Sequence, residues 1–178
     1  MAITKWSVDT AHSNVDFSVR HMMVSKVKGS FNDFSAKVEA DPADLTTASL
    51  KFTINTASID TRNEDRDNHL RSADFFDVEQ YPELTFASTN IEKKGDSIYA
   101  VTGEVSLHGV TRPETFTVTF EGISKDPMSG AEKAGFSVEG TIKRSDYGLT
   151  WNAPLETGGV LVSDDVKISL EIQAAKEA

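Results

Sequence analysis

The chain has 178 residues, and its formal net charge of −10 argues against unspecific attraction to nucleic acid or to an anionic membrane surface, because both need basic patches. Mean hydropathy is −0.33, and no apolar run approaches the roughly 18 residues that a membrane span needs. There is no cysteine, which excludes disulfides and thiolate chemistry.

This length predicts one domain over residues 1–178, without a nucleic-acid partner and without stable membrane insertion. The first residues, MAITKWSVDTAH, lack the charged-then-apolar pattern of a secretory signal. We therefore expect a cytoplasmic protein if the sequence is the whole gene product. If a leader has been removed, we expect a periplasmic or extracellular one.

Most of the chain alternates apolar and polar residues with a period of two, which is typical of half-buried strands. The predicted strand segments are 5–9, 14–21, 24–34, 34–40, 50–54, 84–92 (ending at the polar turn 93–96), 99–107, 116–120, 136–142 and 166–172. Asp41-Pro42 and the loop 126–130 have the composition of turns, and residues 173–178 are expected to be a frayed tail.

These strands have one apolar face each, which favours an antiparallel sheet. About eight of them must close on themselves or stack as two sheets. The bulky inward phenylalanines and the acidic segment between strands favour an all-β, up-and-down antiparallel barrel, and a sandwich remains the alternative. A barrel of about eight strands either fills its interior or holds one small ligand.

One segment, near residues 61–78, breaks the strand pattern and predicts a short helix. Thr61 and Glu64 have the spacing of a capping box, and Asp67 and Arg71 are four residues apart, where opposite charges meet on a helical face. The segment is too polar for a core helix. We interpret it as a lid across the sheet, because its few apolar side chains suffice only to anchor it.

Four groups of residues follow one another along the chain. They are Trp6-Ser7-Val8-Asp9 with His12-Ser13 and Phe17; Val27-Lys28-Gly29-Ser30-Phe31; Arg66-Asp67-Asn68-His69-Leu70 with Ser72, Asp74-Phe75-Phe76, Tyr81-Pro82, Phe86 and Ser88; and Gly103 with Leu107, Gly109-Val110-Thr111, Arg144 and Tyr147-Gly148. Together they resemble the YceI-like, polyisoprenoid-binding proteins over essentially the whole chain. The sequence departs from that pattern at Ser106, where threonine is more usual, and in showing no secretion signal.

The resemblance implies a lipocalin-like barrel that holds a long amphiphile, typically an isoprenoid chain with a polar head, and in some relatives a fatty-acid derivative. It makes a homodimer plausible, and it implies no cofactor. A role in lipid transport or in a stress response is what relatives suggest.

An isoprenoid tail must gain its affinity from apolar area removed from water. At about 25 cal/mol per Å², a tail that buries roughly 400 Å² gains on the order of 10 kcal/mol before the costs of association. The pocket should therefore be aromatic and aliphatic, with polar groups at its mouth. From the residues alone, inward aromatics more often fill a solid core; the resemblance favours a cavity.

The expected ligand-binding residues share an inward position on a strand or a place in the lid. As lining or lid residues we expect Phe17, Phe31, Phe52, Leu70, Phe75, Phe76, Phe86, Phe116, Phe136 and Trp151, and at the mouth Arg66 and His69.

No signature of a serine nucleophile, a zinc protease or a phosphate loop is present. The four histidines are widely spaced, and His12 and His108 are expected in turns. We therefore expect no catalytic residue and no metal site, and we interpret the charges of Arg66, Asp67 and His69 as a solvated helix surface or as a fringe for a head group. The alternatives are an enzyme that acts on a small hydrophobic substrate in the same pocket and a stress-related interaction protein without a ligand.

Overall fold

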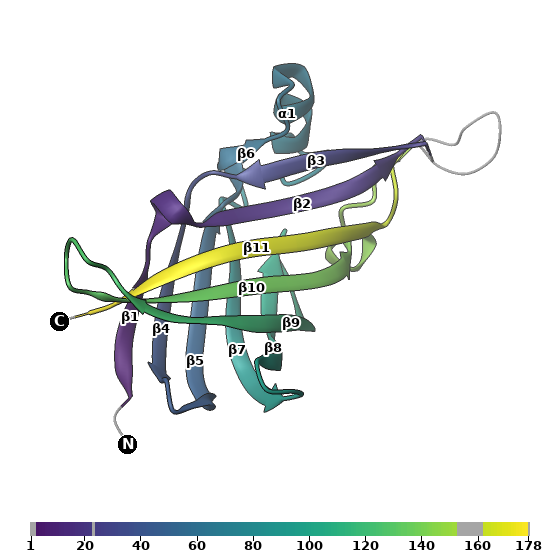
Figure 1. Cartoon of the computed structure of the whole chain (residues 1–178). Coiled ribbons are helices and arrows are strands. Elements are labelled where there is room, and N and C mark those ends of the chain that lie inside the picture. Colours follow the sequence, from purple (N-terminus) through teal and green to yellow (C-terminus); the bar gives the residue numbers. More distant parts are fainter. Residues whose placement is uncertain (1–2, 23, 153–161, 178) are drawn as a thin grey trace.

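The computed structural model describes residues 3–22, 24–152 and 162–177 (Figure 1). In this part of the chain the strands are β1 Thr4–Val8, β2 Asn14–His21, β3 Ser25–Phe31, β4 Phe34–Asp41, β5 Asp44–Asn55, β6 Ile59–Asp60, β7 Glu83–Lys93, β8 Ile98–Leu107, β9 Val110–Lys125, β10 Glu132–Lys143 and β11 Asp165–Lys176. One α-helix, α1 Glu64–Arg71, and three short 3₁₀ turns at Thr10–His12, Thr56–Ser58 and Arg144–Tyr147 complete the described secondary structure.

The described strands pair antiparallel, and from β4 to β11 their order in the sheet follows the chain, with only the two-residue β6 left out. β1 closes the ring because it lies between β4 and β11: Trp6 is opposite Val38 on one side and Lys176 on the other. Eight of the described strands therefore form a closed barrel. The predicted fold class, an antiparallel barrel with a short helical segment, is confirmed.

The β2–β3 hairpin branches from this ring. β11 pairs with β10 over its whole length, with β1 near its C-terminal end and with β2 nearer its N-terminal end, where Ile168 is opposite Phe17. β3 and then β6 continue the sheet beyond β2. In Figure 1 the far end of β2 and β3 extends past the other strands of the barrel.

Two predictions about strand ends were wrong. The predicted strand 24–34 is two strands, because the chain turns between them: the backbone N–H of Asn55 donates to the carbonyl of Asp33 at 2.9 Å, which draws this turn toward β5. The predicted frayed tail 173–178 is paired as far as Lys176, since residues 174–176 lie opposite β1. In both cases the partner strand is distant in sequence, so local composition did not reveal it.

The lid helix begins differently from the prediction. Thr61 and Glu64 form no capping box; instead Asn63 caps α1, and its Oδ1 accepts the backbone N–H of Arg66 at 3.0 Å. Asparagine is as good an N-cap as threonine, and it stands one residue before the helix. The predicted helix is thus confirmed in place, while its cap was assigned wrongly.

The predicted pair of Asp67 and Arg71 is also not formed. The carboxylate of Asp67 is buried and accepts the backbone N–H of Thr61 at 2.9 Å and its hydroxyl. The guanidinium of Arg71 donates to the carbonyls of Ala57 and Ile59, at 2.9 and 3.0 Å. Both charges therefore tie the helix to the chain before it, and they do not form a pair on an exposed face.

The barrel interior has two parts. In the first, which we call the filled half, Trp6 packs among small residues that include Ala134 and Ala174. The neighbouring cluster contains Tyr99, Val101 and Val118, and between the two clusters the rings of Phe120 and Phe136 stand 5.3 Å apart. Side chains occupy this half of the barrel.

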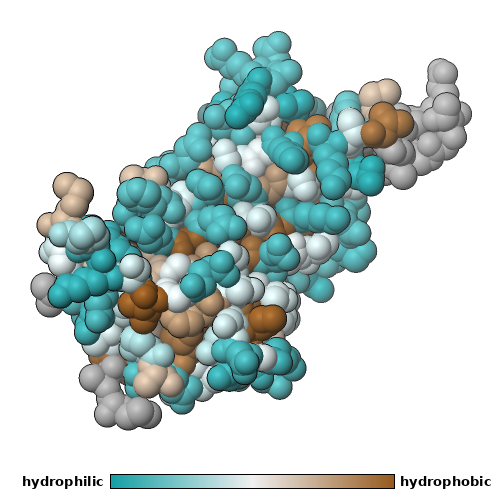
Figure 2. All heavy atoms as spheres, viewed as in Figure 1, coloured by the Kyte–Doolittle hydropathy of each residue, from teal (hydrophilic) through white to brown (hydrophobic). Residues whose placement is uncertain are grey.

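The outer surface shown in Figure 2 is largely hydrophilic, with hydrophobic residues scattered over it. The described part of the chain contains no helix of the length and apolarity that a membrane crossing by a helix requires.

Candidate functional site

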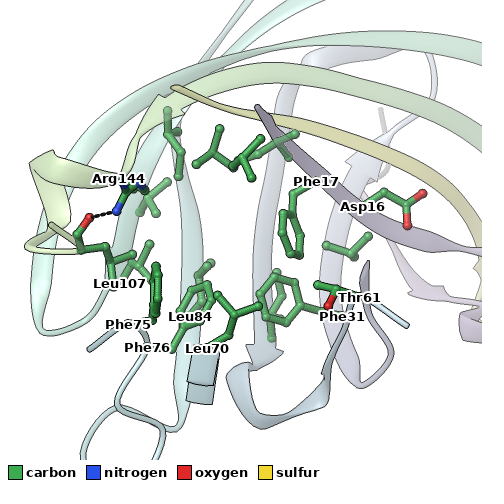
Figure 3. Close-up of a pocket in the computed structure, with 18 of the residues that line it drawn as sticks. Asp16, Phe17, Phe31, Thr61, Leu70, Phe75, Phe76, Leu84, Leu107 and Arg144 are labelled. Atoms are coloured by element: carbon green, nitrogen blue, oxygen red, sulfur yellow. Dashed lines mark hydrogen bonds between the residues drawn. The ribbon is translucent and has the colours of Figure 1, made fainter. Parts of the chain in front are cut away.

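The second part of the interior, which we call the hollow half, encloses a cavity of about 580 Å³. Inward side chains of β2, β3, β5 and β7 to β11 form its wall, and residues of α1 and of the turn after it close one side. Figure 3 shows Phe17, Phe31 and Leu84 directed toward the space, while Asp16 points away from it. The lining is predominantly aliphatic and aromatic, as burial of a hydrocarbon requires.

The structure brings together eleven of the twelve residues that the sequence predicted as ligand-binding. The eleven that line the cavity are Phe17, Phe31, Phe52, Arg66, His69, Leu70, Phe75, Phe76, Phe86, Phe116 and Trp151. Phe136 does not line it, because its ring faces Phe120 and packs in the filled half. The alternation of apolar and polar residues predicted correctly that Phe136 points into the barrel. It did not predict how far along the barrel axis the ring lies.

Three glycines explain how a phenylalanine-rich interior stays hollow. A Cβ at Gly140 would lie 2.3 Å from the ring of Phe116, and one at Gly29 would lie 2.4 Å from the ring of Phe17. A Cβ at Gly103 would lie 2.5 Å from the ring of Phe86. Each ring thus occupies the place of a missing side chain on a neighbouring strand, so it lies against the wall and leaves the lumen vacant.

The lid contributes a cluster of rings at one side of the cavity. The ring of His69 meets Phe75 and Trp151 edge-on, with centroids 5.1 and 4.9 Å apart, and Phe75 lies 5.4 Å from Trp151. The Nε2 of His69 is 2.9 Å from the carboxylate of Asp74, which is half exposed. The cluster therefore joins the apolar cavity to a polar edge that reaches solvent.

Arg66, the other predicted mouth residue, is held by the chain just before α1. Its Nε donates to the hydroxyl of Thr61 at 2.7 Å, and its Nη2 donates to the carbonyl of the same residue at 2.6 Å. Thr61 and Asn63 line the cavity beside it. The guanidinium is thus fixed in place at the rim by backbone and hydroxyl oxygens.

Arg144 is a lining residue that our sequence analysis did not include in the site. It is buried, and it donates hydrogen bonds to the carbonyls of Leu149, Trp151, Val162 and Ser163, at 2.7 to 3.2 Å. Burial lowers the pKa of its guanidinium, and the nearby carboxylate of Asp164 opposes that shift. Within the described residues no carboxylate oxygen lies within ion-pair distance of it.

Arg144 follows directly after the last residue of β10, so a pattern of alternating strand residues does not mark it as inward. The signal in the sequence was its place among the residues that carry the family resemblance. The aliphatic lining residues, among them Leu84, Leu107 and Ile168, could have been listed from the alternation of their strands.

His12 and His108 are turn residues, as predicted, and His21 is the last residue of β2. His12 ends the first 3₁₀ turn, with its Nδ1 2.8 Å from the carboxylate of Asp9. His108 stands in the turn between β8 and β9, with its Nδ1 3.0 Å from the carbonyl of Tyr147. Within the described residues, no three side chains of the metal-ligating types gather in one place.

A second hollow, of about 1100 Å³, lies on the outer face of β2, β3, β10 and β11. Polar and charged side chains such as Ser18, Lys28 and Lys167 line much of it. Beside it, burial and the neighbouring Glu171 raise the pKa of the Asp16 carboxyl. This outer hollow is larger than the cavity, but it offers little apolar surface to a hydrocarbon.

Comparison with known proteins agrees with this architecture. A sequence model of the YceI-like domain matches residues 6–174. The chain is 44% identical, over 165 residues, to a UPF0312 protein of Staphylococcus aureus strain MSSA476, which covers 93% of this chain and 94% of the relative.

Two solved structures are similar to the whole barrel. The crystal structure of Burkholderia cenocepacia BcnA has a TM-score of 0.82 and 30% identity, covering 93% of this chain and 98% of that one. A polyisoprenoid binding domain from Saccharophagus degradans, implicated in plant cell wall breakdown, has a TM-score of 0.69 and 16% identity, covering 97% of this chain and 98% of that one. At that identity, the second comparison shows the fold alone.

Proposed function

The chain belongs to the YceI-like domain family, as its sequence fragments predicted, and on that premise we propose that it binds an isoprenoid or a similar long-chain amphiphilic lipid in the barrel cavity. The observation that carries the proposal is the partly open apolar cavity of about 580 Å³ in the hollow half. The name of the Saccharophagus degradans domain, a polyisoprenoid binding domain with the same fold, supports the same class of ligand.

The size of the cavity sets the scale of the guest. If each non-hydrogen atom takes about 30 Å³, the share of a water molecule in the liquid, the cavity holds about twenty atoms. A tail of about four isoprene units would fill that space, and a longer chain would project past the rim. Burial of such a tail supplies the affinity, because apolar area removed from water is worth about 25 cal/mol per Å².

The polar residues at the rim supply the site for a head group. Arg66, His69 and Arg144 line the cavity together with Trp151, and the lining elsewhere is mostly apolar. A lipid bound tail-first would place its head among these groups, where a hydroxyl or an anionic oxygen finds donors. We therefore propose that the polar part of the lining receives the head group and that the phenylalanine-lined part receives the tail.

We propose further that this binding is non-catalytic and serves sequestration or transport. Three of the ionisable groups that line the cavity are engaged in holding the structure: Arg66 bonds to Thr61, Arg144 bonds to four backbone carbonyls, and His69 is 2.9 Å from the carboxylate of Asp74. A general acid or base needs a group within hydrogen-bond reach of the reacting atom and a suitable pKa. None of these guanidinium groups meets that requirement near neutral pH.

Organic extraction of the purified protein followed by mass spectrometry tests the proposal. We expect about one long-chain lipid per protein molecule. Delipidated protein should regain stability when an isoprenoid alcohol is added: at a hundred times its Kd the ligand adds about 2.7 kcal/mol, which raises Tm by about 5–10 °C for a chain of this size. Empty extracts together with an unchanged Tm would overturn the proposal, and turnover of an added lipid ester would replace it with an enzyme.

A further inference from the structure

The turn between β2 and β3 carries exposed apolar side chains at the end of the molecule. Met22 is 48% exposed and Val24 is 80% exposed, and the backbone N–H of Val24 donates to the carbonyl of His21 at 3.2 Å. We call β2, β3 and this turn the docking hairpin. In Figure 1 the strands of this hairpin reach beyond the barrel, and Figure 2 shows hydrophobic atoms at the same end of the surface.

A methionine at this position is unusual on conformational grounds. Met22 has φ +55°, which lies in the left-handed region that glycine, asparagine and aspartate adopt more readily. A tight turn that only had to reverse the chain in water would use one of those residues. The turn instead holds a large apolar side chain that is 48% exposed, and an apolar surface that covered it would stabilise it.

The same hairpin concentrates positive charge in an acidic protein. Residues 17–31 contain Arg20, Lys26 and Lys28 and no aspartate or glutamate, although the whole chain has a net charge of −10. All three basic residues are exposed, and Arg20 is opposite Lys26 in the register of the two strands. Among the described residues none of the three has a carboxylate within ion-pair distance. An apolar tip is thus flanked by basic strands.

The docking hairpin is also part of the cavity wall. Val19, His21 and Val27 line the cavity, and they come from the last residues before the turn and the first residues after it. His21 also pairs with Val162, which lines the cavity as well and whose carbonyl accepts a hydrogen bond from Arg144. The apolar tip therefore stands next to the same end of the cavity as Arg144.

We propose that the docking hairpin places the cavity mouth on an anionic lipid bilayer, from which the guest is taken up or to which it is delivered. Met22 and Val24 enter the headgroup region, while Arg20, Lys26 and Lys28 lie against lipid phosphates. A few apolar side chains with flanking cations give reversible binding at a bilayer surface, in contrast to insertion across it. The proposal rests on the proposed function for its purpose, since a lipid carrier must meet the membrane that holds its lipid.

Charge favours an anionic bilayer over a second copy of the chain as the partner of the docking hairpin. A second copy of the chain, meeting this one tip to tip, would bring six basic side chains together, and residues 17–31 of neither copy would supply a carboxylate. An anionic surface supplies a counter-charge. The remaining acidic residues repel the surface only weakly, because charges are screened beyond about 10 Å at 0.1 M salt, and the hairpin projects from the barrel.

Sedimentation with vesicles tests the proposal on the full-length protein. The vesicles contain phosphatidylglycerol and phosphatidylcholine in equal parts, or phosphatidylcholine alone. We expect binding to the anionic vesicles that falls as salt is raised and is much weaker on the neutral ones. Lys26→Glu should weaken binding by about thirty-fold, since one attraction is lost and one repulsion is gained, and Val24→Ser by about five-fold.

The matched controls lie on the hairpin between β9 and β10. Met128 is 95% exposed, and Lys125 ends β9, but this hairpin also contains Asp126 and Glu132. Met128→Ser and Lys125→Glu should change binding by less than about two-fold, because their side chains are not held at the membrane. Equal losses in the control and the test variants, or no sedimentation of the unaltered protein, would overturn the proposal.

Organic extraction of the same variants separates this proposal from the proposed function. If both are correct, Val24→Ser and Lys26→Glu retain their lipid but take it up more slowly from anionic vesicles. Retained lipid without vesicle binding would overturn the docking hairpin alone. Vesicle binding with empty extracts would support membrane docking by the hairpin and count against the lipid cavity. Concentration-dependent dimerisation that Val24→Ser abolishes, in place of vesicle binding, would assign the tip to a second copy.

Discussion

The filled half and the hollow half of the barrel interior are built from similar residues, and the cavity of about 580 Å³ lies in the hollow half. In the filled half, the rings of Phe120 and Phe136 face each other at 5.3 Å and occupy the space between their strands. In the hollow half, Phe116 lies over Gly140 and Phe17 lies over Gly29, so each ring is held against the wall.

The comparison shows that the number of aromatic side chains does not determine whether a barrel is solid. The position of each ring relative to the neighbouring strands determines whether the interior is filled. A ring beside a glycine lies in a recess of the sheet, whereas Phe120 and Phe136 are directly opposite each other on their strands and have no such recess.

The rings of the hollow half also contact one another, since the centroids of Phe17 and Phe31, and those of Phe86 and Phe116, are 5.5 Å apart. Interiors pack to a high density wherever side chains can reach one another, so an empty volume of about 580 Å³ requires that these ring pairs lie along the wall of the barrel.

The largest expected effect comes from placing a charge in the hollow half. Phe116→Asp should abolish lipid retention, with at least about a hundred-fold loss of affinity, because an apolar tail would have to desolvate a buried carboxylate. Asp67→Asn is the matched change in the lid. It should have little effect on retention, since an amide oxygen still accepts the hydrogen bonds of Thr61.

Lipid content after purification measures both variants, and circular dichroism first establishes that each is folded. A larger loss of lipid in Asp67→Asn than in Phe116→Asp would assign the binding energy to polar chemistry in the lid and contradict burial of the tail.

Removing one phenylalanine ring from each half should lower the free energy of unfolding by different amounts. Phe136→Ala should lower the free energy of unfolding of the lipid-free protein by about 3 kcal/mol, because it opens a new hole in packed surroundings. Phe86→Ala should cost less, since its ring already borders vacant space. Urea unfolding measures both values. Equal costs, or a larger cost for Phe86→Ala, would mean that the hollow half is packed in solution.

Adding a methyl group should narrow the cavity at a chosen place. In Gly140→Ala the nearest three atoms to the new Cβ all belong to the ring of Phe116, so the ring must turn into the lumen. If it displaces two methylene-sized groups of the guest, at about 0.8 kcal/mol each, affinity falls about ten-fold. Titration of the delipidated protein with an isoprenoid alcohol measures this effect.

Gly135→Ala is the control for that change, because it lies in the same strand and its Cβ would meet only Glu121, at 3.4 Å. It should leave the affinity unchanged. If both alanine variants bind like the unaltered protein, the recess at Gly140 does not set the volume of the cavity.

The smallest expected effect concerns the lid that closes the hollow half. Asn63→Ala removes the side chain that caps α1, which should cost about 1 kcal/mol and so raise the open population of the lid about five-fold. Lipid release to acceptor vesicles should accelerate by the same factor. Asn90→Ala, at an exposed position of β7, is the control. Unchanged release in Asn63→Ala would show that the guest leaves by another route.

The sequence was sufficient to predict the strands and the lid, because both depend on local patterns; it favoured a barrel and left a sandwich as the alternative. Alternation placed Phe17, Phe86 and Phe116 on the inner side of their strands, and the polar run 61–78 was assigned to a helix and turns. The cap at Asn63 was missed, since the pair of Thr61 and Glu64 offered an equally regular spacing. Only the fold shows that Thr61 bonds to Asp67 instead.

Contacts between strands that are distant in the sequence determine the features that the sequence did not predict. Phe136 has the same alternation as Phe116, and the two differ in their height in the barrel and in what lies opposite on the next strand. The pairing of residues 174–176 with β1 depends on the closure of the barrel. The net charge of −10 did not reveal the basic residues of the docking hairpin, because a sum over the whole chain does not show where the charges lie.

A crystal structure of the protein loaded with its extracted lipid tests the central claim most directly. The account predicts electron density for a hydrocarbon chain in the hollow half, along the rings of Phe17, Phe86 and Phe116, with the head group near Arg66, His69 and Arg144. A lipid bound to the outer face of the barrel, or rings of these phenylalanines turned inward so that they fill the lumen, would contradict it.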